Sequence, residues 1–425
     1  MHWPGGVSRV GEHVHTVDDQ EVITPRGLLA TLTATVMLTA LTAGLARADT
    51  LAPNPAVAVT PDEDAMLARW HDMADPAADA AVDDLYAKGQ IGAVNTALTS
   101  WTANGQPLPV GLPPKLRDFL AANLVLPSFT DQATVRRAAV FQADHWMAFL
   151  DASVLGSAPS RTRYPGITEG LVRDLGPAGD TPESGAKASR LVTALMSADP
   201  FGPTGDLLVT ALKVRLVHAA GRHLLKGNWD YHRFGPPISK LYMAAEYQTF
   251  TIEVIDALAR IGAPMSASQA QDFIDVWRVI GTILGLPIGA MPPTVAQTRH
   301  LGDVLNARLE DVNAKAKSYV AGDIAAQAKF FDPPVPSTIG GPLFAALTRK
   351  TLGAADADSF GIPRDRFWDS VADAALPALA GGLGTGPWPS SATLYAPMLA
   401  TVLRMMLDDA KNADIVLPPA FHPVG

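Results

Sequence analysis

The stretch that decides the fold is Asp206–Leu225, DLLVTALKVRLVHAAGRHLL. It predicts one long helix, because its apolar residues recur at intervals of three and four positions. Asp206 follows the helix breakers Pro203 and Gly205, and its carboxylate is expected to cap the first turn. Gly227 is expected to end the helix, because glycine readily adopts a positive φ.

One face of this helix carries an imidazole among apolar and small residues. Steps of three and four positions place on that face Leu207, Ala211, Val214, His218, Gly221, Arg222 and Leu225. A flat, bulky ligand can lie against such a face with His218 bonded to its centre, which is how a haem iron is held. The alternative is a core histidine that donates one hydrogen bond. His223 lies about 140° further around the helix, so the two histidines cannot grip one metal ion as an i, i+4 pair does.

Several strings match one bacterial family in order and at the family's separations. They are KVRLVHAAGRHLL around His218, the following GNWD and FGPPIS, DVWRVIGTILGLPIGAMPP (Asp275–Pro293) and TRKTLGAADADSFGIP (Thr348–Pro363). By these motifs the chain resembles the bacterial latex clearing proteins, haem b rubber oxygenases of the larger rubber oxygenase/MpaB-like family, over roughly Leu108 to Arg366. The resemblance implies a globin-like helical core, a non-covalent haem b, and His218 as the proximal iron ligand.

The family's distal motif, Arg-x-x-Lys-Thr, is altered in this chain. A gap-free alignment backwards from His218 keeps the lysine as Lys187, whereas Ser184 and Ala188 stand in place of the arginine and the threonine. A buried lysine tends to lose its proton, so Lys187 is a candidate to cap the iron or to hydrogen-bond dioxygen. A surface lysine in the first turn of a helix is the alternative. The resemblance also implies a glutamate base, for which Glu169 is the candidate.

Other residues near these motifs have two interpretations each. Haem propionates need cationic or hydrogen-bonding neighbours, and Arg215, Arg222, His223 and Arg233 are candidates, although each can equally be an ordinary solvated or structural side chain. Gly281 and Gly285, four residues apart, let another helix or a flat ligand approach closely, and helix packing is the simpler explanation.

Composition restricts the functional classes. The chain has 425 residues, of which 48% are hydrophobic and 18% charged, which suits a large apolar core. A formal net charge of −9 without any run of Lys and Arg argues against nucleic-acid binding. The absence of cysteine excludes disulfides, thiolate ligation and covalently attached c-type haem, so a haem must be held by ligation and packing alone.

The N-terminal region predicts export. Arg26 precedes an uncharged apolar stretch at 27–45, and Ala46-Arg47-Ala48 matches a cleavage pattern, so residues 1–48 are predicted to be a signal peptide cleaved after Ala48. A retained membrane anchor is the alternative, because the stretch is just long enough to span a bilayer. Family relatives commonly carry a twin-arginine signal, whereas this chain offers only Arg26 at that place. The export route therefore stays open.

The rest of the chain predicts an all-α fold, a globin-like core with additional N- and C-terminal helices. Residues 49–60 are expected to be a linker and residues 61–425 a single helical domain. No strand alternation, fixed-period repeat, G-x-S-x-G, H-E-x-x-H, Rossmann or P-loop motif is present. Long single helices are expected at 131–154, 239–261 and 295–329.

The resemblance leads to one main functional hypothesis and two alternatives. The main hypothesis is a secreted, monomeric haem b oxygenase that uses O2 to cleave a C=C bond of polyisoprene or a related isoprenoid, with aldehyde and ketone products and no stable membrane span after signal cleavage. A haem-binding carrier or gas sensor without catalysis is the second hypothesis, motivated by the altered distal motif. A helical exported protein without cofactor is the third.

Overall fold

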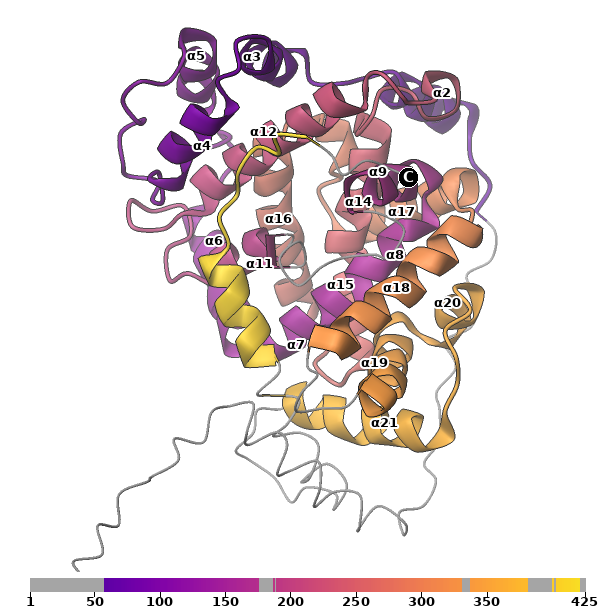
Figure 1. Cartoon of the computed structure of the whole chain (residues 1–425). Coiled ribbons are helices and arrows are strands. Elements are labelled where there is room, and N and C mark those ends of the chain that lie inside the picture. Colours follow the sequence, from indigo (N-terminus) through magenta and orange to yellow (C-terminus); the bar gives the residue numbers. More distant parts are fainter. Residues whose placement is uncertain are drawn as a thin grey trace, which may run out of the picture.

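The computed structural model describes residues 57–175, 186–187, 189–330, 337–380, 400 and 403–420. Every regular element in these ranges is helical, so the predicted all-α class is confirmed (Figure 1). Within the described part, no helix has both the length and the apolarity that crossing a membrane requires. The predicted signal peptide and most of the predicted linker lie outside the described residues.

The N-terminal half contains α2 (Pro61–His71), α3 (Pro76–Ala87), α4 (Ile91–Thr99), α5 (Pro114–Asn123), α6 (Gln132–Asp144), α7 (Trp146–Asp151), the π-helix η2 (Ala152–Ser157), α8 (Ala158–Ser160), the 3-10 helix η3 (Arg161–Arg163), α9 (Pro165–Leu175) and α11 (Arg190–Leu195). The other half contains α12 (Leu207–Leu225), α13 (Tyr231–Phe234), α14 (Lys240–Phe250), α15 (Ile252–Arg260), α16 (Ala267–Ile283), η4 (Ile288–Ala290), α17 (Val295–Leu309), α18 (Ala314–Phe330), α19 (Ser337–Leu352), α20 (Ala354–Ser359) and α21 (Arg366–Ala380). A further helix covers 403–412.

Helix α12 crosses the molecule near the end formed by α3, α4 and α5, whereas α19 and α21 lie at the opposite end (Figure 1). It packs against α3, α11 and α16. Its first half is buried on every side, and Leu207, Ala211 and Leu212 have no exposed surface. Burial on this scale, and not helix propensity, supplies most of the stability of such a helix.

The start of α12 is capped by a residue from a distant part of the chain. The predicted cap by Asp206 is wrong, because its carboxylate makes no capping hydrogen bond and pairs with Arg190 instead. Asn104 takes its place: its Oδ1 accepts hydrogen bonds from the backbone N–H groups of Leu208 (3.1 Å) and Val209 (3.2 Å). Gly227 does not adopt the expected positive φ, and the helix ends at Lys226 in a right-handed conformation.

Each of the three long predicted helices is divided in the structure. His145 separates α6 from α7, and its Nδ1 lies 2.9 Å from the carbonyl oxygen of Phe141. Thr251 separates α14 from α15 with φ −116° and ψ −81°. Asn313 opens α18 by accepting hydrogen bonds from the backbone N–H groups of Lys315 and Ala316. Side-chain hydrogen bonds to nearby backbone compete with helix continuation at such positions.

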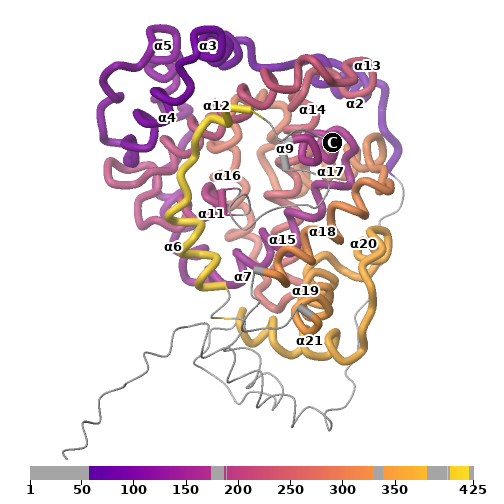
Figure 2. The backbone as a smooth tube through the Cα atoms, in the orientation of Figure 1, coloured from indigo at the N-terminus to yellow at the C-terminus, as the bar shows by residue number. Residues whose placement is uncertain are grey.

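The C-terminal end of the described chain lies against the N-terminal helices. The segment 413–420 runs from the helix at 403–412 toward α3 and α4 (Figure 2). Asn95 on α4 exchanges two hydrogen bonds of 2.9 Å with the backbone of Leu417, and Tyr86 on α3 donates to the carbonyl oxygen of Pro418. These hydrogen bonds therefore tie the C-terminal end of the described chain to α3 and α4.

The π-helix η2 follows a buried acid. Asp151 is 2% exposed, and its Oδ2 accepts a hydrogen bond of 2.9 Å from Thr351 on α19. Burial raises the pKa of Asp151 to about 7, and the hydrogen bond from Thr351 opposes this shift only in part. Asp151 thus stays protonated in the folded protein at pH values where an unfolded chain would have lost the proton.

We expect Asp151→Asn to remove a pH dependence of stability. A pKa raised by folding makes the protein lose stability as pH rises from about 4 to about 7, on the order of 1 kcal/mol per pH unit, and the loss then levels off. Asparagine does not titrate, so the variant does not lose stability in this way. Its free energy of unfolding should therefore increase relative to that of the natural protein between pH 5 and pH 7. Urea unfolding at several pH values measures the difference, with Asp144→Asn as the exposed control. A difference in the free energy of unfolding between Asp151→Asn and the natural protein that does not change with pH would contradict this explanation.

Candidate functional site

His218 lies halfway along α12 on a face that the described residues do not cover completely. Val214, Arg215, Val217 and His218 are partly exposed, although Leu216 between them is buried. The Nδ1 atom of His218 is itself buried and has no hydrogen-bond partner in the described part of the chain. A buried polar atom without a partner costs free energy and calls for an explanation. The simpler interpretation of the sequence, a core histidine that donates a hydrogen bond, therefore does not fit His218.

The surroundings keep His218 neutral. Burial, together with the positive charges of Arg222 and Lys240, lowers the pKa of His218 to about 3. A neutral imidazole retains a nitrogen lone pair, which is the form that binds metal ions. The partly open apolar face and the unpartnered ring together fit the requirements of a haem ligand.

Three buried charged groups from three helices meet beside His218. Asp75, the N-cap residue of α3, accepts two hydrogen bonds from Arg215 of α12, with distances of 2.7 and 3.1 Å, and lies 3.5 Å from Lys240 Nζ of α14. Burial alone would raise the pKa of Asp75, but Arg215 and Lys240 outweigh burial and hold it below its usual value. We call Asp75, Arg215 and Lys240 the buried ion cluster.

Arg222, one turn after His218, retains unused hydrogen-bonding capacity. Its Nε donates to Asp79 at 2.6 Å and its Nη1 to the carbonyl oxygen of Ile238 at 3.4 Å, whereas its buried Nη2 has no partner. Burial raises the pKa of Asp79 despite the nearby Arg222. Arg222 can therefore bind a further anionic or carbonyl group on the same face of α12 as His218.

The other three cationic candidates for haem propionates have partners of their own. All three nitrogens of Arg215 donate, to Asp75, Asn123 and the carbonyl oxygen of Ile283. The Nδ1 of His223 lies 2.6 Å from Asp83, and its ring stacks on Tyr86 at 4.1 Å. Arg233 is exposed, with its guanidinium over the ring of Phe234.

The two glycines at the end of α16 serve packing. A Cβ at Gly281 would come within 2.3 Å of the sulfur of Met291. Gly285 has φ +86°, and a Cβ there would lie 2.7 Å from Asp75 and 2.9 Å from Arg215. Gly285 is therefore required by the buried ion cluster, both for its backbone conformation and for the space it leaves.

No contact with His218 is described for Lys187 or Glu169. Lys187 precedes α11, which packs on α12, and its side chain is partly exposed. Glu169 on α9 pairs with Arg173 and, at 2.6 Å, with Lys315 on α18. Burial would raise the pKa of Glu169, but these two cations hold it below its usual value. The roles of Lys187 and Glu169 in catalysis stay predictions. Ser184 and Ala188 lie outside the described residues.

Sequence reasoning missed Asp75 and Lys240. Asp75 precedes Pro76, a pairing typical of a helix start, so its position at a cap was predictable. Lys240 opens the nearly apolar run KLYMAAEY, where a lysine is unusual. Their proximity to His218 was not predictable, because Asp75 lies far from α12 in sequence.

Comparison with known proteins identifies the family. Residues 189–384, which include His218, match the model of the ER-bound oxygenase mpaB/B'/rubber oxygenase catalytic domain. The rubber oxygenase of Streptomyces sp. (strain K30) is 30% identical over 366 residues, which cover 83% of this chain and 86% of the relative.

The fold has a counterpart among solved structures. A structure of latex clearing protein LCP in the closed state superposes with a TM-score of 0.68 at 24% sequence identity, over 80% of this chain and 91% of that one. This likeness concerns the fold, and the sequence match to the Streptomyces enzyme carries the assignment. The chain belongs to the rubber oxygenase family and is an oxygenase of that family.

Proposed function

We propose that the chain is an exported, haem b-dependent oxygenase that cleaves C=C bonds of polyisoprene or a related isoprenoid with O2 and leaves aldehyde and ketone ends. The observation that carries the proposal is His218: a neutral imidazole with a buried, unpartnered nitrogen on a partly open apolar face of α12. Haem supplies, when bound, the activation of dioxygen.

The residues proposed to hold the haem lie on one face of α12. His218 would ligate the iron, and Val214 with Val217 would contact the apolar macrocycle. Arg222 would bind a propionate through its Nη2, which has no hydrogen-bond partner among the residues that the structure describes. Without cysteine, no thioether bond can tether the group, so acid and organic solvent should extract it.

The remaining parts of the proposal concern substrate and location. Lys187 would face the oxygen site, and Glu169 is the proposed base. A polyisoprene chain offers only apolar contacts, which favours an apolar channel between helices. An insoluble polymer stays outside the cell, which agrees with the predicted signal peptide at 1–48. A monomer suffices for this chemistry.

We expect haem-loaded protein to consume O2 with rubber latex or with short oligoisoprenoids, and to form carbonyl products that mass spectrometry detects. Lys187→Met should lower O2 consumption while leaving the Soret band in place, because the variant keeps His218 and Arg222. Lys317→Met, at an exposed position on α18, is a matched control for loss of a lysine. Turnover of neither substrate by the natural protein would contradict the proposed activity.

The altered distal motif supports a second candidate, a haem-binding carrier or gas sensor without catalysis. That function would give a Soret band and reversible ligand binding, with no product from any alkene. The double change Ser184→Arg and Ala188→Thr restores the family's motif, and activity gained by it would assign the inactivity to these two positions. Protein that stays colourless after haem addition would contradict both candidates.

A further inference from the structure

The side chains beside His218 bury more positive than negative charge. On α12, Arg215 lies three positions before His218 and Arg222 lies four positions after it, and residues at these spacings are neighbours on the surface of a helix. Lys240 of α14 is the third cation, and its side chain is 5% exposed. Two carboxylates pair with these three cations, Asp75 and Asp79. The described ion pairs therefore leave one positive charge over.

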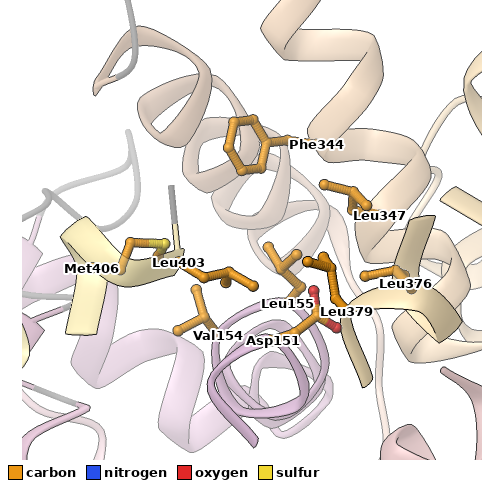
Figure 3. Close-up of a pocket in the computed structure, with 9 residues that line it drawn as sticks. All are labelled: Asp151, Val154, Leu155, Phe344, Leu347, Leu376, Leu379, Leu403 and Met406. Atoms are coloured by element: carbon orange, nitrogen blue, oxygen red, sulfur yellow. The ribbon is translucent and has the colours of Figure 1, made fainter. Parts of the chain in front are cut away.

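Pairing with cations, and not burial, decides which of the buried acids are charged. Asp75 accepts two hydrogen bonds from Arg215, and its pKa lies below its usual value although burial would raise it. Figure 3 shows the carboxyl of Asp151 beside Leu155 and Leu379. Burial among such apolar side chains raises the pKa of Asp151 to about 7. At pH 6, Asp75 is therefore a negative charge in the buried ion cluster, whereas Asp151 is mostly neutral.

The imidazole of His218 receives no negative partner of its own. A histidine that binds a metal ion usually donates its other ring N–H to a carboxylate, a carbonyl or water, which makes the ligand more basic. Nδ1 of His218 is enclosed by protein, which leaves Nε2 to bind iron, and Nδ1 has no acceptor among the described residues. His218 would therefore serve as a neutral ligand that gives the iron little additional electron density.

We propose that the buried ion cluster, together with Arg222, forms a positively charged support for His218 that favours the reduced state of the haem iron. Gain of one electron lowers the charge on the iron by one, and nearby positive charge stabilises the less positive state. Burial strengthens this effect, because the interior screens charges less than water does. The reduced iron is the state of haem that takes up dioxygen. The inference rests on the proposed function for the haem, and not for the substrate.

Two substitutions of opposite charge test the proposal. Lys240→Met removes a positive charge and should lower the reduction potential of the haem-loaded full chain, whereas Asp75→Asn removes a negative charge and should raise it. Each should change the ratio of reduced to oxidised iron at a fixed potential several-fold. Methionine is an apolar side chain of similar length, and burial already disfavours the charge of Lys240, so this variant is expected to fold. Spectroelectrochemical titration at pH 6, followed in the Soret band, measures the potentials.

Each substitution has a matched control. Lys213→Met removes another buried lysine, whose pKa burial also lowers to about 8, as for Lys240. Lys213 lies five positions before His218, about 140° around α12. Asp151→Asn removes a buried acid that is mostly protonated at pH 6. Both control variants should keep the reduction potential of the natural protein.

The outcomes separate this proposal from the proposed function. An unchanged potential in Lys240→Met would overturn the proposal, whether or not Asp75→Asn folds, and so would an equal shift in Lys213→Met. Shifts of the same sign in Lys240→Met and Asp75→Asn would indicate a structural disturbance and would overturn it as well. Protein that takes up no haem would overturn both the proposed function and this inference. Haem-loaded protein with the expected shifts but without isoprenoid turnover would overturn only the proposed activity.

Discussion

His218→Ala is expected to abolish haem retention. The natural protein should purify with haem b or take it up, and the variant should lose it during gel filtration. The axial bond is the interaction specific to His218, whereas the apolar contacts of Val214 and Val217 persist in the variant. Changes in groups that merely surround a metal ligand typically cost about 10- to 100-fold in affinity, so removal of the ligand itself should cost more. The ratio of Soret to protein absorbance measures the effect.

His223→Ala is the matched control, since it removes an imidazole from the same helix. His223 stacks on Tyr86 and pairs with Asp83, so its functional groups are engaged away from His218. The variant should keep its haem and its spectrum. If the His218→Ala variant retained a full haem complement with an unchanged spectrum, the assignment of the proximal ligand would be wrong.

The second large effect is expected from Asp75→Asn. Asparagine keeps the size of the side chain and its ability to cap α3, but it removes the negative charge from the buried ion cluster. Arg215 and Lys240, 12% and 5% exposed in their side chains, would then stay buried without a counter-charge. Breaking a buried pair in this way costs about 3–5 kcal/mol. Urea or thermal unfolding of the protein should show a loss of that order.

Asp64→Asn tests whether burial is the cause. Both carboxylate oxygens of Asp64 also accept hydrogen bonds from one arginine, because Nε and Nη2 of Arg308 donate to them at 2.6 and 2.8 Å. That pair, however, lies on the surface. Surface ion pairs contribute little to stability, so this variant should unfold almost as the natural protein does. Equal destabilisation by the two substitutions would contradict the special role given to the buried ion cluster.

Some helices carry the signals of their own boundaries in residues close together in the sequence. Thr60, Pro61 and Glu63 start α2 with a complete capping box, and Ser266 with Gln269 does the same for α16. Prediction failed at His145 and Thr251, because apolar periodicity continued across both positions. At both positions the backbone leaves the helical conformation, and the spacing of apolar residues gives no sign of this change.

The sequence by itself determined the all-α class, the long helix at Leu207–Leu225, the family and the choice of His218 as the residue to examine. These follow from residues close together in the chain, since helix periodicity and short motifs are local properties. Only the tertiary structure decided which polar groups around His218 are already paired. Asn104 caps α12 and Asp75 neutralises Arg215 and Lys240, and both come from distant segments. Whether a buried polar group has a partner depends on contacts between helices, and that pairing leaves His218 Nδ1 and Arg222 Nη2 unpartnered on one face.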